Sequence, residues 1–166
     1  MIVSMQEYTR LTNAGRVMLT EEDEDLVLNL AQKIARNRLR RVSIHCVADL
    51  KSYLRNVYYG SPNEMFGILW LDTKHNVIEF DQSLFNGTID GAAVYPRVVV
   101  REALRHNASA CFLTHNHPSG SSIPSQADIA LTRRLKESLA LIDVQVLDHM
   151  VCGAEDVTSL AERGLM

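Results

Sequence analysis

Residues 110–135 read ACFLTHNHPSGSSIPSQADIALTRRL, and this stretch decides both the fold and the candidate site. The apolar run from Ala108 to Thr114 predicts a short strand, and a loop rich in Ser, Gly and Pro follows it. Ser125 is typical of an N-cap, so we expect a helix from there to about Leu141. The stretch therefore predicts a strand, a loop and a helix in that order.

Two histidines and an aspartate lie along this stretch at the spacing of metal ligands. His115 and His117 are one residue apart where the strand gives way to the loop, so their imidazoles share one side of an extended chain. Asp128 falls in the first turn of the helix, and its side chain is expected to point back toward the loop. Three ligands of these types, with the fourth position left to water, are typical of a catalytic zinc site.

Each of these features also has an ordinary structural explanation. A His-x-His pair at a strand end is more often a surface or structural pair, and an aspartate in a first helical turn complements the helix dipole. Ser125 either caps its helix or faces the metal. The conjunction of the three features, in the right order of elements, favours a Zn2+ site formed by His115, His117 and Asp128.

The composition is that of an ordinary soluble protein. The chain has 166 residues, 46% of them hydrophobic and 22% charged, which fits one domain with a short appended segment. A net charge of -3 gives no general attraction to nucleic acid, and the arginines at positions 36–41 are expected to form a solvated helix face.

Cys46, Cys111 and Cys152 lack paired spacing, so we expect free thiols in a reducing cytoplasm. No signal peptide or apolar run of membrane-spanning length is visible, so we expect no membrane partner.

The remaining periodicities predict an alternation of helices and strands. We expect an N-terminal arm and helix within residues 1–42, where Thr20 caps a helix over 21–39, and a second domain over 43–166. Within that domain the predicted helices are 47–58 and 96–106, and the predicted strands are 64–71, 77–85, 144–152 and 157–160. This order predicts an α/β (α+β) sandwich, in which a mixed sheet carries helices on its faces.

The histidine stretch resembles a known signature. The spacing His115-x-His117-x7-Ser125-x2-Asp128 is similar to the JAMM motif of the MPN+ metallo-isopeptidases, and His115-Asn116-His117-Pro118-Ser119-Gly120 resembles the version found in the bacterial RadC family. Segments 64–72, 87–88, 94–97 and 103–108 agree with that family. The resemblance covers residues 43–166. The length and ending are most similar to the short RadC-like proteins of prophages and mobile elements, which lack a helix-hairpin-helix region.

The resemblance implies roles for five residues and a fold. His115, His117 and Asp128 would bind Zn2+, and Glu64 would correspond to the glutamate that activates the metal-bound water. Ser125 would correspond to the serine that helps to hold the oxyanion. The fold would be the cytidine-deaminase-like three-layer sandwich of MPN/JAB domains. Without the resemblance, Glu64 is one acidic residue among many.

The implied function is that of a zinc metallohydrolase, a peptidase or isopeptidase with Glu64 as general base. Two alternatives stay open: a DNA-associated RadC-like protein with repair or phosphodiester chemistry, and a non-catalytic MPN interaction module. A zinc nucleobase deaminase is excluded, because its HxE and PCxxC motifs are absent. The substrate and the oligomeric state are not given by the motif.

Five further polar side chains are candidates for structural or supporting roles. His149 follows Asp148 on a late strand, where it is either an ordinary strand histidine or a group that orients a ligand or the water. Asn116 is expected to hydrogen-bond within its loop. His75 and His106 are expected in turns or on the surface, as is His45.

Overall fold

The computed structural model describes residues 20, 22–23, 25–31, 47–87 and 93–166. Contacts divide the chain into two units, Met1–Ile34 and Ala35–Met166. The predicted domain boundary at 42/43, the arginines at 36–41, His45 and Cys46 lie outside the described residues.

In the first unit, residues 22–23 and 25–31 are helical, and the rest of the helix predicted over 21–39 lies outside the described residues. Thr20 caps this helix as predicted: its Oγ1 accepts a hydrogen bond from the Asp23 amide at 3.2 Å, and its own amide donates to the Asp23 carboxylate at 3.1 Å.

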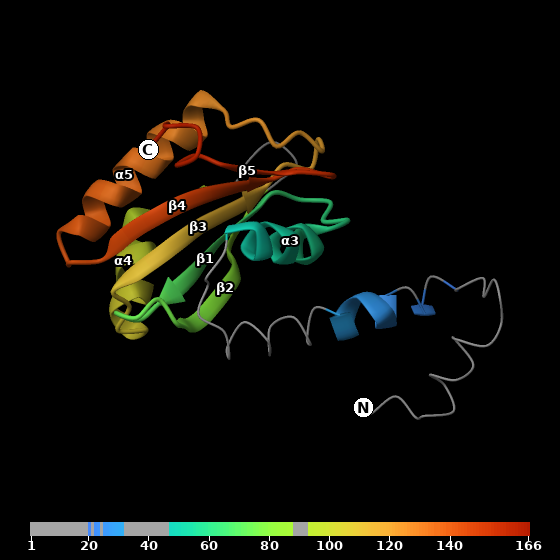
Figure 1. Cartoon of the computed structure of the whole chain (residues 1–166), viewed down its shortest axis with the longest axis horizontal. Coiled ribbons are helices and arrows are strands. Elements are labelled where there is room, and N and C mark those ends of the chain that lie inside the picture. Colours follow the sequence, from blue (N-terminus) through green and yellow to red (C-terminus); the bar gives the residue numbers. More distant parts are fainter. Residues whose placement is uncertain (1–19, 21, 24, 32–46, 88–92) are drawn as a thin grey trace. The chain divides into compact units, whose positions relative to one another are not determined.

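The second unit is built on a five-stranded mixed sheet in the order β2-β1-β3-β4-β5 (Figure 1). The strands are β1 (Met65–Leu71), β2 (Val77–Asn86), β3 (Ala110–Asn116), β4 (Gln145–Cys152) and β5 (Val157–Ser159). β3 and β4 run parallel, and every other neighbouring pair is antiparallel. β3 lies at the centre, so both of its edges are hydrogen-bonded.

Helices cover both faces of this sheet (Figure 1). Their bounds are α3 (Val47–Tyr58), α4 (Pro96–Arg105) and α5 (Gln126–Ala140). The apolar side of α3, with Leu50, Leu54 and Val57, packs against one face, and the apolar sides of α4 and α5 pack against the other. This confirms the predicted α/β (α+β) sandwich, and the predicted elements differ from the observed ones by only one or two residues at most ends.

The alternation of β3 decides which way the candidate ligands point. Cys111 and Leu113 face the layer of α4 and α5, whereas Phe112 faces α3. Because side chains alternate along a strand, His115 lies on the α5 side and Asn116 on the α3 side. The predicted strand end at Thr114 was two residues too early. The strand continues because β1 still pairs with His115, and β4 pairs with both His115 and Asn116.

Two further expectations concern the cysteines and membrane-spanning segments. Cys111 and Cys152 are buried and free, as predicted, and burial raises the pKa of Cys111 to about 12. Among the described residues, no helix combines the length and the apolar character that crossing a membrane requires.

Candidate metal centre

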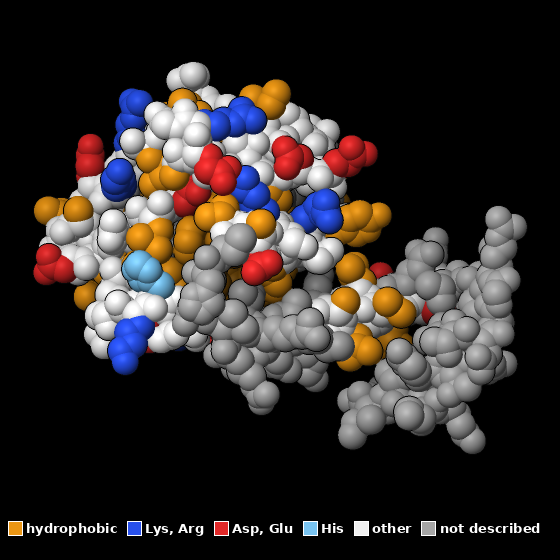
Figure 2. Space-filling view, viewed as in Figure 1, with side chains coloured by type: hydrophobic (Ala, Val, Ile, Leu, Met, Phe, Trp, Pro, Cys, Tyr) orange, Lys and Arg blue, Asp and Glu red, His pale blue; other side chains and the backbone are white. Residues whose placement is uncertain are grey.

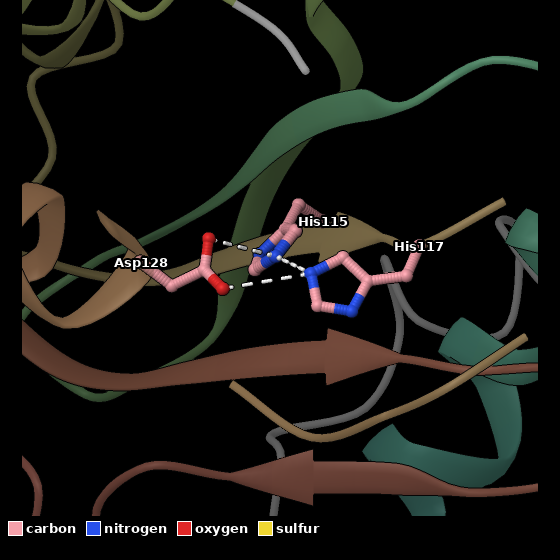
Figure 3. Close-up of side chains that lie close together, drawn as sticks. All are labelled: His115, His117 and Asp128. Atoms are coloured by element: carbon pink, nitrogen blue, oxygen red, sulfur yellow. Dashed lines mark hydrogen bonds and ion pairs between the residues drawn. The ribbon is translucent and has the colours of Figure 1, made fainter. Parts of the chain in front are cut away.

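The structure brings the three predicted ligands together at the end of β3 and the start of α5 (Figure 3). Nε2 of His115 lies 3.0 Å from Nε2 of His117, and the two oxygens of Asp128 lie 3.2 Å and 3.5 Å from these nitrogens. With metal–ligand bonds of about 2.0–2.2 Å, neighbouring ligand atoms of a tetrahedral zinc site are about 3.3 Å apart. The observed distances therefore fit one small tetrahedral cation.

His117 presents Nε2 because its other nitrogen is engaged. Nδ1 lies 2.8 Å from the main-chain carbonyl of Ser121, and a carbonyl can only accept, so Nδ1 carries the proton. In the neutral ring, Nε2 then has a lone pair. The His117 amide also donates to the Cys152 carbonyl at 2.9 Å, which ties this end of the chain to β4.

His115 is oriented by a directed chain of hydrogen bonds. The Thr132 hydroxyl donates its proton to the Asp128 main-chain carbonyl at 2.6 Å. The Thr132 Oγ1 atom must therefore accept in its other contact, from Nδ1 of His149, also at 2.6 Å. Nε2 of His149 then accepts from Nδ1 of His115 at 2.9 Å, which leaves a lone pair on Nε2 of His115. Burial and the neighbouring His115 hold the pKa of His149 well below its usual value, so His149 is neutral.

These contacts bear on the two interpretations of His149. Its ring is fully buried at 0% exposure and bridges a candidate ligand to α5. This arrangement favours a group that orients a candidate ligand over an ordinary strand histidine. The sequence could not reveal the contact, because it depends on the parallel pairing that sets His149 beside Leu113.

Ser125 and Asp128 form a capping box at the start of α5. The Ser125 hydroxyl oxygen accepts from the Asp128 amide at 3.1 Å, and the Ser125 amide donates to the Asp128 carboxylate at 2.6 Å. Ser125 is therefore a cap, one of its two predicted roles. Because its oxygen accepts in this contact, its O–H proton is able to donate. A side-chain hydrogen bond with Ser125 also helps to lower the pKa of Asp128.

The electrostatics of the centre favour a positive charge among these atoms. Burial raises the pKa of Asp128, but hydrogen bonds from His115 and His117 outweigh it and hold this pKa well below the usual value. The hydrogen bond with Asp128 is also the main cause that raises the pKa of His117, against the effect of burial, and the charge of Glu64 adds to it. A metal ion would supply the charge that otherwise needs a proton on a ring.

Glu64 immediately precedes β1 and is half-buried. β1 and β3 are antiparallel with Phe66 opposite His115, so extending this register places Glu64 opposite His117, on the same side of the sheet. Its influence on the pKa of His117 agrees with that placement. The structure thus places Glu64 on the same side of the sheet as His115 and His117, near enough for its charge to act on His117.

His106 lies in the turn after α4, as predicted, and its side chain is 9% exposed. This side chain stacks on Trp70 with ring centroids 5.8 Å apart and contacts Asp81 at 3.2 Å. Asn116 was expected to hydrogen-bond within its loop, but its side chain bonds to Asn63, just before β1, and to Met65, the first residue of β1. His75 is exposed in a turn, as predicted.

A family model described as the RadC-like JAB domain matches residues 44–165. The chain belongs to the RadC family. Relatives at high identity carry the name UPF0758 protein. One from Marinobacter nauticus is 46% identical over 167 residues, which covers 100% of this RadC-family chain and 73% of the relative. Another, from Azotobacter vinelandii, is 51% identical over 139 residues, 83% of the chain and 62% of the relative.

These similarities show the family and support the JAB/MPN-type fold of this RadC-family chain. A third relative, from Stutzerimonas stutzeri, is 52% identical and is likewise matched over 62% of its length. The names of these relatives state no activity. The assignment to the short type found in prophages and mobile elements stays a prediction.

Proposed function

We propose that this protein is a zinc-dependent hydrolase of peptide or isopeptide bonds, with His115, His117 and Asp128 as ligands. One observation carries the proposal: two Nε2 lone pairs and a carboxylate converge, and the second nitrogen of each histidine is already engaged. Imidazole and carboxylate ligands, three in number, are typical of catalytic zinc.

When bound, Zn2+ supplies Lewis-acid activation of a water molecule and of a carbonyl group. Glu64 lies on the same side of the sheet as the ligands, so its carboxylate can take a proton from the attacking water and pass it to the leaving amine. The O–H of Ser125, at the start of α5, can turn to donate to the oxygen that gains negative charge. His149 and Thr132 hold the His115 ring in place throughout.

The test is a peptide-library cleavage assay with zinc-loaded protein and its Glu64→Gln variant. We expect about one equivalent of zinc in both proteins, and a loss of turnover of about 10²–10⁴-fold in the variant. Glu137→Gln is the matched control, because Glu137 is exposed on α5. Protein purified gently that takes up no zinc would contradict the proposal, as would unchanged turnover in Glu64→Gln.

The two alternative functions predict different results. On the face drawn in Figure 2, the Lys and Arg side chains of the described residues are interspersed with Asp and Glu, and this arrangement does not favour a phosphate backbone. DNA binding with a steep salt dependence would support the DNA-associated alternative. Zinc binding without turnover on any peptide would support a non-catalytic module.

A further inference from the structure

We propose that Asn116 positions Glu64 by holding the main chain on both sides of it, an inference that rests on the proposed role of Glu64 as the base. Asn116 ends β3 and is 3% exposed. Its side-chain nitrogen donates to the carbonyl of Asn63 at 3.1 Å, and its side-chain oxygen accepts from the amide of Met65 at 2.8 Å. One side chain thus bonds to the residue before Glu64 and to the residue after it.

The two bonded atoms belong to the two peptide groups that flank the Glu64 Cα. Because peptide groups are planar, fixing both of them fixes φ and ψ of Glu64, and therefore the direction of its Cα–Cβ bond. The carbonyl of Glu64 is held as well, by the Gly87 amide at 2.9 Å. The side chain of Glu64 consequently starts from a fixed point and in a fixed direction.

The location of these bonds explains why a side chain is needed. Main-chain pairing of β1 with β3 ends at Phe66 and His115, so Glu64 lies beyond the last pair. Beyond this pair, the side-chain carboxamide of Asn116 connects the two segments in place of main-chain hydrogen bonds. Asn116 lies between His115 and His117, so this short segment presents the two proposed ligands on one face. The Asn116 side chain, on the other face, holds the main chain on both sides of the proposed base.

The contact also accounts for the residue type. A carboxamide offers a donor and an acceptor on one planar group, and both are used here. A Ser or Thr side chain is shorter and has a single oxygen, so it cannot span the two peptide groups. An Asp side chain keeps the acceptor but loses the donor.

The experiment compares Asn116→Leu and Asn116→Asp, each alone and combined with Glu64→Gln. Asn63→Ala is the matched control, because Asn63 takes part only through its main-chain carbonyl. The first readout is amide hydrogen exchange in zinc-loaded protein. We expect exchange at Met65 to accelerate at least about tenfold in Asn116→Leu, and much less in Asn116→Asp, which keeps the acceptor.

The second readout is the pH dependence of the visible spectrum of the Co2+-loaded protein, which needs no substrate. Glu64→Gln is expected to shift this profile, Asn116→Leu to shift it in the same direction, and the double variant to shift it no further. With a cleavable peptide, kcat of Asn116→Leu should fall about 10–100-fold while KM changes little. Metal stoichiometry should stay at one throughout, and Asn63→Ala should match the wild type.

The outcomes separate this inference from the proposed function. If Glu64→Gln shifts the profile and Asn116→Leu does not, the positioning role is wrong and the base assignment survives. If neither variant shifts the profile or the turnover, both are wrong. If both Asn116→Leu and Asn116→Asp fail to bind metal, Asn116 is a purely structural residue and the inference is overturned.

Discussion

Two groups of His and acidic side chains in the described part of the chain lie close enough to share a metal ion, and their other contacts differ. They are His115, His117 and Asp128 at the end of β3, and Asp81, Glu102 and His106 near α4. In the first group, the second nitrogen of each histidine donates to a fixed acceptor, and this leaves the Nε2 lone pairs facing the carboxylate.

In the second group, cations and donors of the protein already engage the ligand atoms. Glu102 is paired with Arg105 and with Arg101, the latter at 3.0 Å. Asp81 accepts from the Trp70 indole at 2.8 Å. The comparison teaches that ligand type alone does not define a metal site, because the neighbouring donors decide whether the ligand atoms are available.

The largest expected effect comes from removing a ligand of the first group. His115→Ala should lose the bound zinc, because only one imidazole and one carboxylate would remain. His106→Ala, in the second group, should keep one equivalent. Metal analysis after equilibrium dialysis compares the two variants. Zinc retained by His115→Ala, or lost from His106→Ala, would contradict the claim that the first group and not the second binds the metal.

A smaller effect is expected from the hydrogen-bond chain behind His115. Thr132→Val keeps the shape of the side chain but removes the acceptor for His149, so zinc affinity should fall about 10–100-fold. Thr114→Val is the control, because this buried hydroxyl bonds to Tyr58 on the opposite side of the sheet at 2.7 Å. Competition with a chromophoric chelator measures the zinc affinity of both variants. An equal fall in affinity in the two variants would show that general destabilisation, and not the hydrogen-bond chain, is the cause.

The loop that holds His117 allows a third test. A Cβ on Gly153 would lie 2.5 Å from the Gly120 carbonyl and 2.7 Å from the Ser122 amide, so Gly153→Ala must displace the loop that carries the Ser121 carbonyl. We expect zinc affinity to fall about tenfold. Gly60→Ala is the control: it costs about 1 kcal/mol through its positive φ but has open space around it. Its zinc affinity should not change.

The smallest effect concerns the second group. The hydrogen bond from Arg105 lowers the pKa of Glu102 below its usual value of 4.5, so the pair stabilises the fold above that pH and loses its effect as pH falls through the lowered pKa. Glu102→Gln should reduce the free energy of unfolding by at most about 1 kcal/mol at pH 7, because both arginines are exposed. The urea midpoints of the wild type and of Glu102→Gln should converge as pH falls from 7. A difference between the two midpoints that stays constant with pH would show that the Glu102–Arg105 pair does not cause it.

The sequence was sufficient for the features that depend on local periodicity. His115 and His117 alternate with Asn116 on a strand, and Asp128 lies in the first turn of a capped helix, so their convergence follows from one strand-loop-helix segment. The helices and strands of the sandwich were predicted for the same reason, because their apolar patterns are local.

The sequence was insufficient where contacts depend on strand register. Glu64 immediately precedes another strand and needed the resemblance to the RadC family, since no local pattern gives the antiparallel pairing of β1 with β3. His149 depends on the parallel pairing of β3 with β4, and its partner Thr132 comes from α5. The turn at His106 was predicted, but its stacking on Trp70 was not, because Trp70 lies on a strand far away in sequence.

The most direct test of the comparison is anomalous diffraction at the zinc edge from crystals of the zinc-loaded chain. We predict one peak within about 2.0–2.2 Å of Nε2 of His115, Nε2 of His117 and a carboxylate oxygen of Asp128. No peak is expected beside Asp81, Glu102 and His106. A peak at that second group, or none at the first, would contradict the central claim that engaged second nitrogens make His115 and His117 a metal site.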